Sequence, residues 1–221
     1  MCNFLSVLIL KNGDVRWHPM LDSHSDLVTY FDLPDANAHI RHFAKAELTP
    51  TDDWLDPSTW TWRIDEETRP DWLDDVDAQA EALTRAIAQR MILTEHTKIP
   101  RLIVDGCWIV GGKGIVHDVR GGRILRVQDS AQVTNVGGAA RVTDVGGSAQ
   151  VTNVGGSAQV TNVGGSAQVR DVRDSAQVTN VRDSAQVTNV WGSAQVTNVW
   201  GSAQVRNVGG SAQVTNVWGS A

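Results

Sequence analysis

The second residue of the chain, Cys2, is the first whose chemistry suggests catalysis. Removal of Met1 would leave Cys2 with a free α-amine beside its thiol, as in N-terminal nucleophile hydrolases, where the amine can act as the base. Asn3, Arg16 and His18 would then be candidates to stabilise an oxyanion or to orient a substrate. The alternative is a small buried cysteine at the start of an apolar strand, and we expect Cys2 to have this structural role.

A metal site is a second kind of chemistry that the N-terminal part suggests, because histidine and carboxylate side chains recur there. The residues concerned are His18, Asp22 and His24, with His39 and His42 further along the chain. Their spacing matches no established short metal-binding motif, and neither cysteine completes a set. We therefore expect His24 to lie at a helix terminus, and we predict neither a metal nor any other cofactor.

Asp65, Glu66 and Glu67 form a run of carboxylates that could supply a general acid and a general base. The alternative, which is the commoner arrangement in proteins, is a charged strand end before a helix. Carboxylates near the start of a helix interact favourably with its dipole. We expect this structural role for the run.

Tryptophan and arginine residues in the C-terminal half are the strongest indication of a binding surface. They interrupt a repeated phrase, and the tryptophans do so where the chain is expected to turn; exposed aromatic groups mark interaction surfaces. The alternative is that each tryptophan folds over neighbouring glycines and screens the backbone. The predicted binding surface consists of Trp191, Trp200, Trp218, Arg170, Arg173, Arg182 and Arg206.

The elements that position these side chains follow from the repeated phrase. Residues 130–219 divide into ten nonapeptides with the consensus Ser-Ala-Gln-Val-Thr-Asn-Val-Gly-Gly. Alanine and valine alternate with glutamine, which is the period of a half-buried strand. Thr-Asn is expected to bend the chain so that the second valine also turns inward, and Gly-Gly makes the next corner. Because one coil cannot stand alone, such a short repeat predicts a β-solenoid of stacked coils.

The corner pair at repeat positions eight and nine indicates the length of a coil. It is Gly-Gly in the first four repeats, then Arg-Asp twice, Trp-Gly twice, Gly-Gly and Trp-Gly, so the first eight repeats group in pairs. This grouping predicts eighteen residues per coil, with Val133, Val136, Val142 and Val145 all pointing inward. Duplication of repeat pairs would give the same grouping without any geometry. Three nonapeptides per coil is the structural alternative, and it would place Val133 over Val160.

The part that precedes the repeats is predicted to be an α+β domain over residues 1–102 that caps the first coil. A hairpin is expected in FLSVLIL-KNGD-VRWHP, with Asn12-Gly13 at its turn. A short helix follows in SHSDLVTYF, and HFAKAEL and TWTWRID alternate as strands. Pro70 opens a predicted long helix. The apolar residues of that helix at helical spacing are Ala80, Leu83, Ala86, Ile87 and Met91.

Coils are expected to begin before the consensus phrase does. In residues 103–129 the segments IVHDVRGG and RILRVQD keep the V-x-x-V spacing of VTNV, which predicts degenerate first coils. Residues 130–221 then form the nonapeptide-repeat β-solenoid. The predicted fold class is therefore an α+β N-terminal domain followed by a β-solenoid, or β-helix.

Composition excludes several classes of function. The net charge of −6 argues against a general nucleic-acid binder, which normally presents a basic face. The repeats are close to neutral and do not imitate DNA, and arginine at 170 and 206 interrupts the threonine rows that an ice-binding surface would need.

The apolar segment FLSVLIL is too short to cross a bilayer and lacks the flanks of a signal peptide. Two cysteines fit a reducing compartment, so we expect a cytoplasmic protein with no membrane partner.

Several phrases resemble those of a group of bacterial and phage-associated proteins without an assigned activity: MCNFLSVLILKNGDV, LDSHSDLV, FAKAELTP and IDEETRPDW. Members of that group open with MCNF, carry DSH-x-DL and E-x-TP segments, and end in short repeats similar to SAQV. The resemblance covers the whole chain and implies the same plan of an N-terminal domain followed by repeats. It implies no catalytic residue.

The expected function is non-enzymatic: an α+β domain carries a repeat surface that binds a protein partner. The alternative is a small enzyme or ligand-binding N-terminal domain, with Cys2 as a nucleophile and the repeats as a stalk. A last coil that stops at Ala221 would expose unpaired backbone groups, which favours strand addition. We expect association through this C-terminal coil, in its simplest form as a two-fold homodimer, and fraying of the coil is the alternative.

Overall fold

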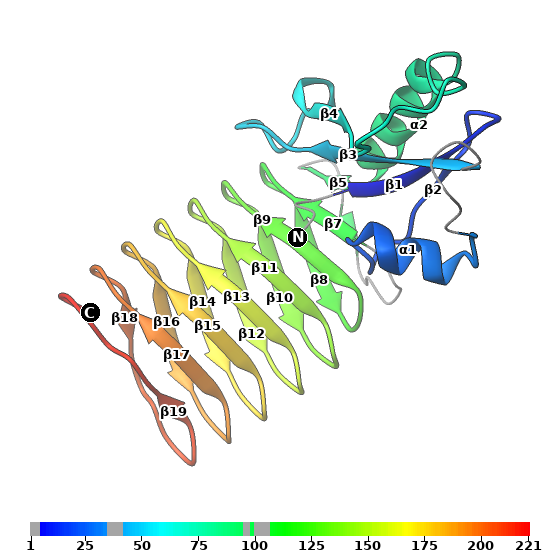
Figure 1. Cartoon of the computed structure of the whole chain (residues 1–221). Coiled ribbons are helices and arrows are strands. Elements are labelled where there is room, and N and C mark those ends of the chain that lie inside the picture. Colours follow the sequence, from blue (N-terminus) through cyan, green and yellow to red (C-terminus); the bar gives the residue numbers. More distant parts are fainter. Residues whose placement is uncertain (1–4, 35–41, 95–97, 100–106) are drawn as a thin grey trace. The chain divides into compact units, whose positions relative to one another are not determined.

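The computed structural model of the chain describes residues 5–34, 42–94, 98–99 and 107–221. The chain forms two compact units, Met1–Met91 and Ile92–Ala221. The first is an α+β unit and the second a parallel β-solenoid, which confirms the predicted fold class (Figure 1). The predicted boundary at residue 102 lies inside the second unit, because solenoid strands already begin at Ile92.

The first unit contains a four-stranded antiparallel sheet in the order β2-β1-β3-β4. The predicted hairpin is confirmed, since β1 pairs with β2 and Gly13 turns the chain with φ +81°. The two later strands lie where alternation predicted them. Val7, Leu8 and Ile9 are all buried, as expected of an apolar strand covered on both faces. The bounds are β1 Leu5–Leu10, β2 Val15–Arg16, β3 Phe43–Thr49 and β4 Thr61–Ile64.

Two α-helices and a 3₁₀ helix accompany this sheet: α1 His24–Tyr30, η1 Pro57–Thr59 and α2 Asp77–Arg90. The predicted start of the long helix at Pro70 is wrong, because residues 70–76 form turns instead. Arg69 holds these turns against the helix through ion pairs of 2.6 Å to Asp77 and to Asp74. The hydrogen bonds that Arg69 donates to Asp77, and then to Asp74, raise the pKa of Arg69 above its usual range.

No helix among the described residues has the length and apolar content needed to cross a membrane.

The predicted apolar face of the long helix is confirmed in part, since Ala80 and Met91 are buried whereas Leu83 and Ala86 are exposed. Thr84 and Ala88 of α2 are buried as well. Thr84 satisfies its hydroxyl by donating to the Ala80 carbonyl at 2.7 Å, so its burial leaves no polar group unpaired. The small residues thus form the packed stripe, and the larger Leu83 lies outside it.

The second unit consists of two parallel sheets between which the chain alternates. We call the sheet of even-numbered strands, β6 to β18, the even sheet, and the sheet of odd-numbered strands, β5 to β19, the odd sheet. The strands of the first coils are β5 Ile92–Leu93, β6 Lys98–Ile99, β7 Cys107–Val110, β8 Ile115–Val119 and β9 Arg123–Val127. The consensus repeats form β10 Gln132–Val136, β11 Arg141–Val145, β12 Gln150–Val154, β13 Gln159–Val163, β14 Gln168–Val172, β15 Gln177–Val181, β16 Gln186–Val190, β17 Gln195–Val199, β18 Gln204–Val205 and β19 Gln213–Val214.

The coil length of eighteen residues is confirmed. Val133 pairs with Val151 on the even sheet, and Val142 pairs with Val160 on the odd sheet. The four valines predicted to point inward are buried, and they belong to one continuous core of alanine and valine. Thr-Asn lies within the strands rather than between them, so the chain keeps its ladder hydrogen bonds while both valines of a repeat face the core. Each fully buried valine contributes about 1.5–3 kcal/mol.

The strands before the consensus repeats continue the same stack. Val116 of β8 pairs with Val133, and Ile124 of β9 pairs with Val142. The step is seventeen residues from Val116 to Val133 and eighteen from Ile124 to Val142, so the earlier coils join the same stack although some are a residue shorter. Isoleucine and valine occupy their inward positions.

The second residue of each corner pair has a left-handed backbone conformation. Gly138 has φ +62° and Gly156 has φ +66°, and at the same repeat position Asp174 and Asp183 have φ +61° and +62°. Aspartate is one of the few residues other than glycine that adopt this conformation readily. The Asp174 carboxylate also accepts a hydrogen bond of 2.8 Å from the Gly156 N–H one coil earlier. The Arg-Asp corners therefore preserve the turn that Gly-Gly makes.

Replacement of Gly138 by alanine is expected to lower the free energy of unfolding by about 1–2 kcal/mol, which is the cost of a Cβ in the left-handed region. The new Cβ would also lie 2.5 Å from the carbonyl oxygen of Arg120. Gly137→Ala is the matched control, because a Cβ there meets no described atom within 4 Å outside its chain neighbours. Chemical denaturation of the two full-length variants measures the difference, and equal midpoints would contradict the expectation.

Candidate functional site

The residues proposed for chemistry in the N-terminal part are not brought together. Cys2 and His39 lie outside the described residues. His18 accepts a hydrogen bond of 3.2 Å from the Met20 N–H and packs on the ring of Tyr30, with centroids 4.5 Å apart. His42 is exposed. Within the described part of the chain, neither His18 nor Asp22 joins His24 in a group of possible metal ligands.

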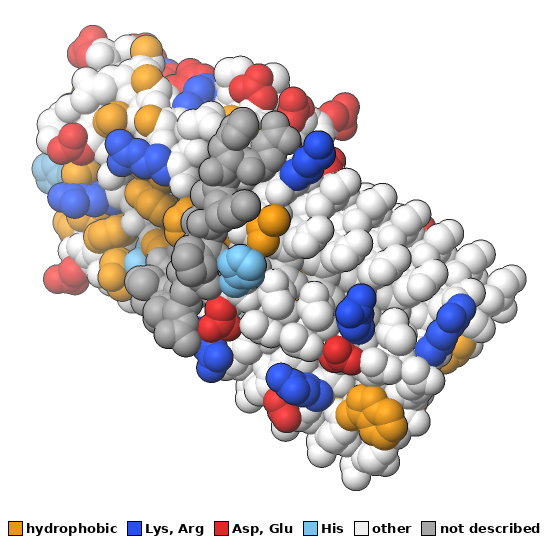
Figure 2. All heavy atoms as spheres, turned by 180° about the vertical axis from the view of Figure 1, so that it is seen from behind, with side chains coloured by type: hydrophobic (Ala, Val, Ile, Leu, Met, Phe, Trp, Pro, Cys, Tyr) orange, Lys and Arg blue, Asp and Glu red, His pale blue; other side chains and the backbone are white. Residues whose placement is uncertain are grey.

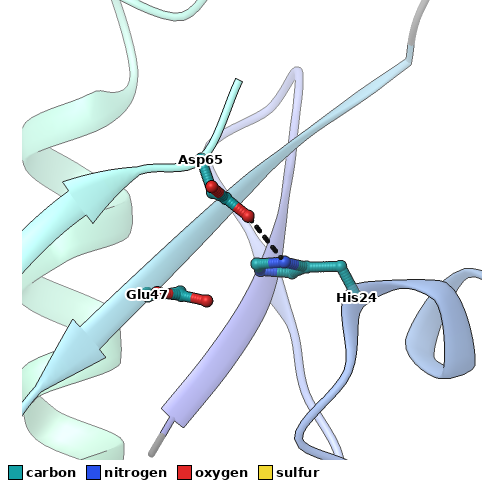
Figure 3. Close-up of side chains that lie close together, drawn as sticks. All are labelled: His24, Glu47 and Asp65. Carbon is teal, nitrogen blue, oxygen red and sulfur yellow. Dashed lines mark ion pairs between the residues drawn. The ribbon is translucent and has the colours of Figure 1, made fainter. Parts of the chain in front are cut away.

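The structure instead places His24 beside Glu47 and Asp65 (Figure 3). His24 is the first residue of α1, Glu47 lies on β3, and Asp65 follows the last residue of β4. One nitrogen or oxygen of each side chain lies within 4.8 Å of the others. His24 and Glu47 are only 6% and 8% exposed, whereas the Asp65 side chain is 40% exposed. We call these three residues the His24 cluster.

Hydrogen bonds orient each member of the His24 cluster. His24 Nδ1 lies 3.3 Å from Asp65 Oδ2, and Nε2 of the same ring lies 3.0 Å from the carbonyl oxygen of Ala46. Arg63 donates from Nη2 to Glu47 Oε2 at 3.0 Å and to Asp65 Oδ1 at 3.4 Å. One guanidinium therefore contacts both carboxylates, and the cluster combines two anionic groups, one fixed cation and an imidazole.

The carboxylate run considered as an acid–base pair does not converge on one point. Asp65 belongs to the His24 cluster, whereas Glu66 accepts a hydrogen bond of 2.8 Å from the Lys45 backbone N–H. Glu67 is exposed. The run therefore divides into one cluster residue, one backbone contact and one surface residue.

Spacing along the chain could not have indicated this cluster, because its members come from three separated elements. A weaker signal was present. His24 lies in the phrase DSHSDL, Glu47 in AELTP and Asp65 in IDEET, and these phrases carried the resemblance described above. Each contributes one side chain to the same place.

The tryptophans of the predicted binding surface, with Arg173 and Arg182, divide between two edges of the solenoid. Corner residues one coil apart are stacked, since Trp191 donates its backbone N–H to the Val172 carbonyl just before Arg173, and Trp218 does the same to the Val199 carbonyl just before Trp200. The corners that follow even-sheet strands form the even edge: Arg120, Gly137, Gly155, Arg173, Trp191 and Gly209. Those that follow odd-sheet strands form the odd edge: Gln128, Gly146, Gly164, Arg182, Trp200 and Trp218.

A groove of about 360 Å³ lies along the even edge. Glycine corners of two successive coils leave it open, because they carry no side chains. Arg120 and Asp118 bound it at one end, and Arg173 and Asp174 bound it at the other. Arg120 is paired with Asp118 at 2.9 Å. The remaining lining residues are Asn135, Val136, Gly137, Gly138, Asn153, Gly155 and Gly156.

Trp191 follows Arg173 on the even edge, and its side chain both packs and remains exposed. A Cβ added at Gly209 would lie 2.2 Å from Cζ3 of Trp191, so the ring covers that glycine, as the alternative interpretation expected. Trp191 is nevertheless 50% exposed. On the odd edge, Trp200 is partly buried and Trp218 is 55% exposed.

Arg170 and Arg206 both lie on the even sheet, at the repeat position that is otherwise threonine. Figure 2 shows charged side chains scattered over rows of uncharged ones on a face of the solenoid. The odd sheet keeps threonine at this position from Thr143 to Thr215. The two arginines therefore interrupt the threonine rows on the even sheet only.

Asparagine ladders run along both sheets and differ in one respect. On the odd sheet each asparagine donates to the residue one coil earlier, from Asn216 through Asn198, Asn180 and Asn162 to Asp144. On the even sheet Asn189 donates to Asp171, and Asn153 donates to Asn135. Asp171 has no donor to offer Asn153, so the described ladder is interrupted between these two residues.

The interruption falls in the repeat 166–174, which departs most from the consensus. It contains Arg170, Asp171, Arg173 and Asp174. Among the described residues no carboxylate lies within ion-pairing distance of Arg170 or Arg173. Charge has therefore been introduced here at the expense of a ladder hydrogen bond, and no ion pair replaces that bond.

Comparisons of the chain with protein-family models, with curated proteins and with solved structures found no match. The resemblance of the N-terminal phrases stays a prediction. The interpretation of the His24 cluster and of the even edge therefore rests on their geometry.

Asp171→Asn is expected to raise the free energy of unfolding by about 1 kcal/mol, the net value of one hydrogen bond, because the new amide can donate to Asn153. Asp144→Asn is the matched control. Its partner one coil earlier is Arg126, which offers no asparagine oxygen to bond. Denaturation midpoints of the full-length variants measure the effect, and a gain no larger for Asp171→Asn than for Asp144→Asn would refute it.

Proposed function

We propose that this chain is a non-enzymatic interaction protein whose solenoid presents the even edge to a protein partner. The observation that carries the proposal is the charged repeat 166–174, which gives up a ladder hydrogen bond beside the half-exposed Trp191. Residues that break a local rule of the fold without a structural gain are expected at functional sites.

The chemistry of the edge favours an acidic segment as the partner. Arg170 and Arg173 have no ion pair among the described residues, and Arg206 lies on the same sheet. Arginine binds carboxylates through paired hydrogen bonds, and arginine and tryptophan are the side chains most enriched at the centre of interfaces. The glycine corners of the groove leave room for an extended chain between Arg120 and Arg173.

A protein partner fits this edge better than a nucleic acid does. The groove contains Asp118 and Asp174 beside its arginines, and the chain carries a net charge of −6. A phosphate backbone would meet these carboxylates at both ends of the groove. A polypeptide can match both signs of charge.

The remaining expectations about context stay predictions. An enzymatic or ligand-binding N-terminal domain with Cys2 as nucleophile is the alternative function, and Cys2 lies outside the described residues. A cytoplasmic location and a homodimer formed through the C-terminal coil are also kept as predictions. None of them is needed for binding at the even edge.

The repeat symmetry supplies a matched test of the proposal. We expect Arg173→Ala/Trp191→Ala to reduce recovery of the partner from a lysate of the source cells at least about tenfold, since a single interface hot spot is worth that much. Arg182→Ala/Trp200→Ala makes the same two replacements on the odd edge and should retain the partner. Quantitative mass spectrometry of proteins bound to each full-length variant measures both.

Two outcomes would reject the even edge as the binding surface. One is the same set of bound proteins for wild type and Arg173→Ala/Trp191→Ala. The other is an equal loss with the odd-edge variant. Recovery that falls as salt is raised would support recognition of an acidic segment, because exposed charge pairs are screened.

A further inference from the structure

The His24 ring is held in one orientation by the backbone of β3. Its Nε2 lies 3.0 Å from the Ala46 carbonyl oxygen, and a carbonyl can only accept a hydrogen bond. Nε2 therefore carries a proton, and Nδ1 is the nitrogen directed at Asp65. Histidines that ligate metals are usually fixed in this way, with the second ring nitrogen donating to a carbonyl or carboxylate.

The separation of His24 and Asp65 is long for a direct ion pair and also fits two ligands of one ion. A hydrogen bond between an imidazolium and a carboxylate usually measures about 2.7–2.9 Å. The Nδ1 to Oδ2 distance is 3.3 Å. Ligand atoms bound at about 2.0–2.1 Å around a tetrahedral zinc ion lie roughly 3.3–3.4 Å from each other. The pair therefore already has the spacing of one edge of such a tetrahedron.

Glu47 and Arg63 complete the arrangement. One oxygen of the Glu47 carboxylate lies within 4.8 Å of both a ring nitrogen of His24 and a carboxylate oxygen of Asp65. Arg63 donates to Glu47 Oε2 and to Asp65 Oδ1, so it orients both carboxylates from outside the cluster. Ligating carboxylates are themselves commonly hydrogen-bonded in this manner, and such outer partners set the direction of the ligand atoms.

We propose that His24, Glu47 and Asp65 bind a divalent transition-metal ion, and that Zn²⁺ fits the three ligands best. One imidazole and two carboxylates suit Zn²⁺, whereas Mg²⁺ binds oxygen ligands almost exclusively. The Asp65 side chain is 40% exposed, so an ion can enter from solvent and keep water as a further ligand. The ion joins α1 to β3 and to the end of β4.

This inference is independent of the proposed function, because the three ligands lie in the first unit and the even edge lies in the second. Loss of zinc binding would leave partner binding by the solenoid untouched. The competing account of the same geometry is an ion pair between protonated His24 and Asp65 that needs no metal. The two accounts differ in whether Zn²⁺ binds.

Titration calorimetry of the full-length protein with Zn²⁺ tests the proposal, with Asp65→Asn as the main variant. This substitution preserves size at a partly exposed position, so the fold is expected to persist, and circular dichroism checks it. Asp26→Asn is the matched control: it removes the same charge from an exposed residue of α1. We expect one Zn²⁺ site that Asp65→Asn weakens at least tenfold, because even outer-shell changes cost about 10–100-fold. Asp26→Asn should leave it unchanged.

Glu47→Gln provides a second variant, and it should weaken the same site. Mg²⁺ added in place of Zn²⁺ should bind far more weakly. The proposal is overturned if the wild-type chain binds no Zn²⁺, if Asp65→Asn and Glu47→Gln both bind it as the wild type does, or if Asp26→Asn weakens it equally. It is also overturned if Mg²⁺ binds as tightly as Zn²⁺, since general attraction to acidic groups would then explain the data.

Discussion

The backbone hydrogen bond between residues one coil apart is the interaction on which the solenoid depends. Gln168 donates to the Ala149 carbonyl, Gln186 donates to the Ala167 carbonyl, and the same bond recurs through the consensus repeats. These bonds hold the strands in a register of eighteen residues, so each repeat position lies on its counterpart one coil earlier, in most cases on a residue of the same type. Burial, corner conformation and the asparagine ladders all follow from this one step. A coil has no core of its own, and stacking supplies it.

Against such a uniform background, departures from the repeat are of two kinds. Asp174 replaces glycine at a left-handed corner, and its carboxylate bonds the Gly156 N–H, so the turn is maintained. Asp171 replaces asparagine and interrupts a ladder. The first substitution is compatible with stability alone, whereas the second costs a hydrogen bond. Both occur in the same repeat, together with two arginines, which is why that repeat carries the functional interpretation.

Features with a local or periodic physical signal could be predicted from the sequence. The paired corners gave the coil length, and Asn12-Gly13 located the hairpin turn. The buried face of α2 could not be predicted in full: Leu83 was expected inside, but helical spacing does not reveal that Thr84 satisfies its own hydroxyl and is buried. The partners of His24 could not be predicted either. Glu47 lies on β3 and Asp65 directly after β4, and only the folded sheet determines which side chains meet there.

Because successive nonapeptides alternate between the two sheets, the number of repeats that precede a nonapeptide determines the sheet to which it belongs. Loss or gain of two consecutive nonapeptides would change the length of the solenoid by one coil and keep each later residue on its own sheet. Loss or gain of a single nonapeptide would move all later residues to the opposite sheet. One nonapeptide inserted between Asp183 and Ser184, for example, would move Trp191 into the column of Arg182. The packing of the core would be unchanged, since alanine and valine occupy the same repeat positions on both sheets. Core packing therefore tolerates the loss or gain of any number of repeats. The arrangement of surface residues in columns is kept only when an even number of repeats is lost or gained.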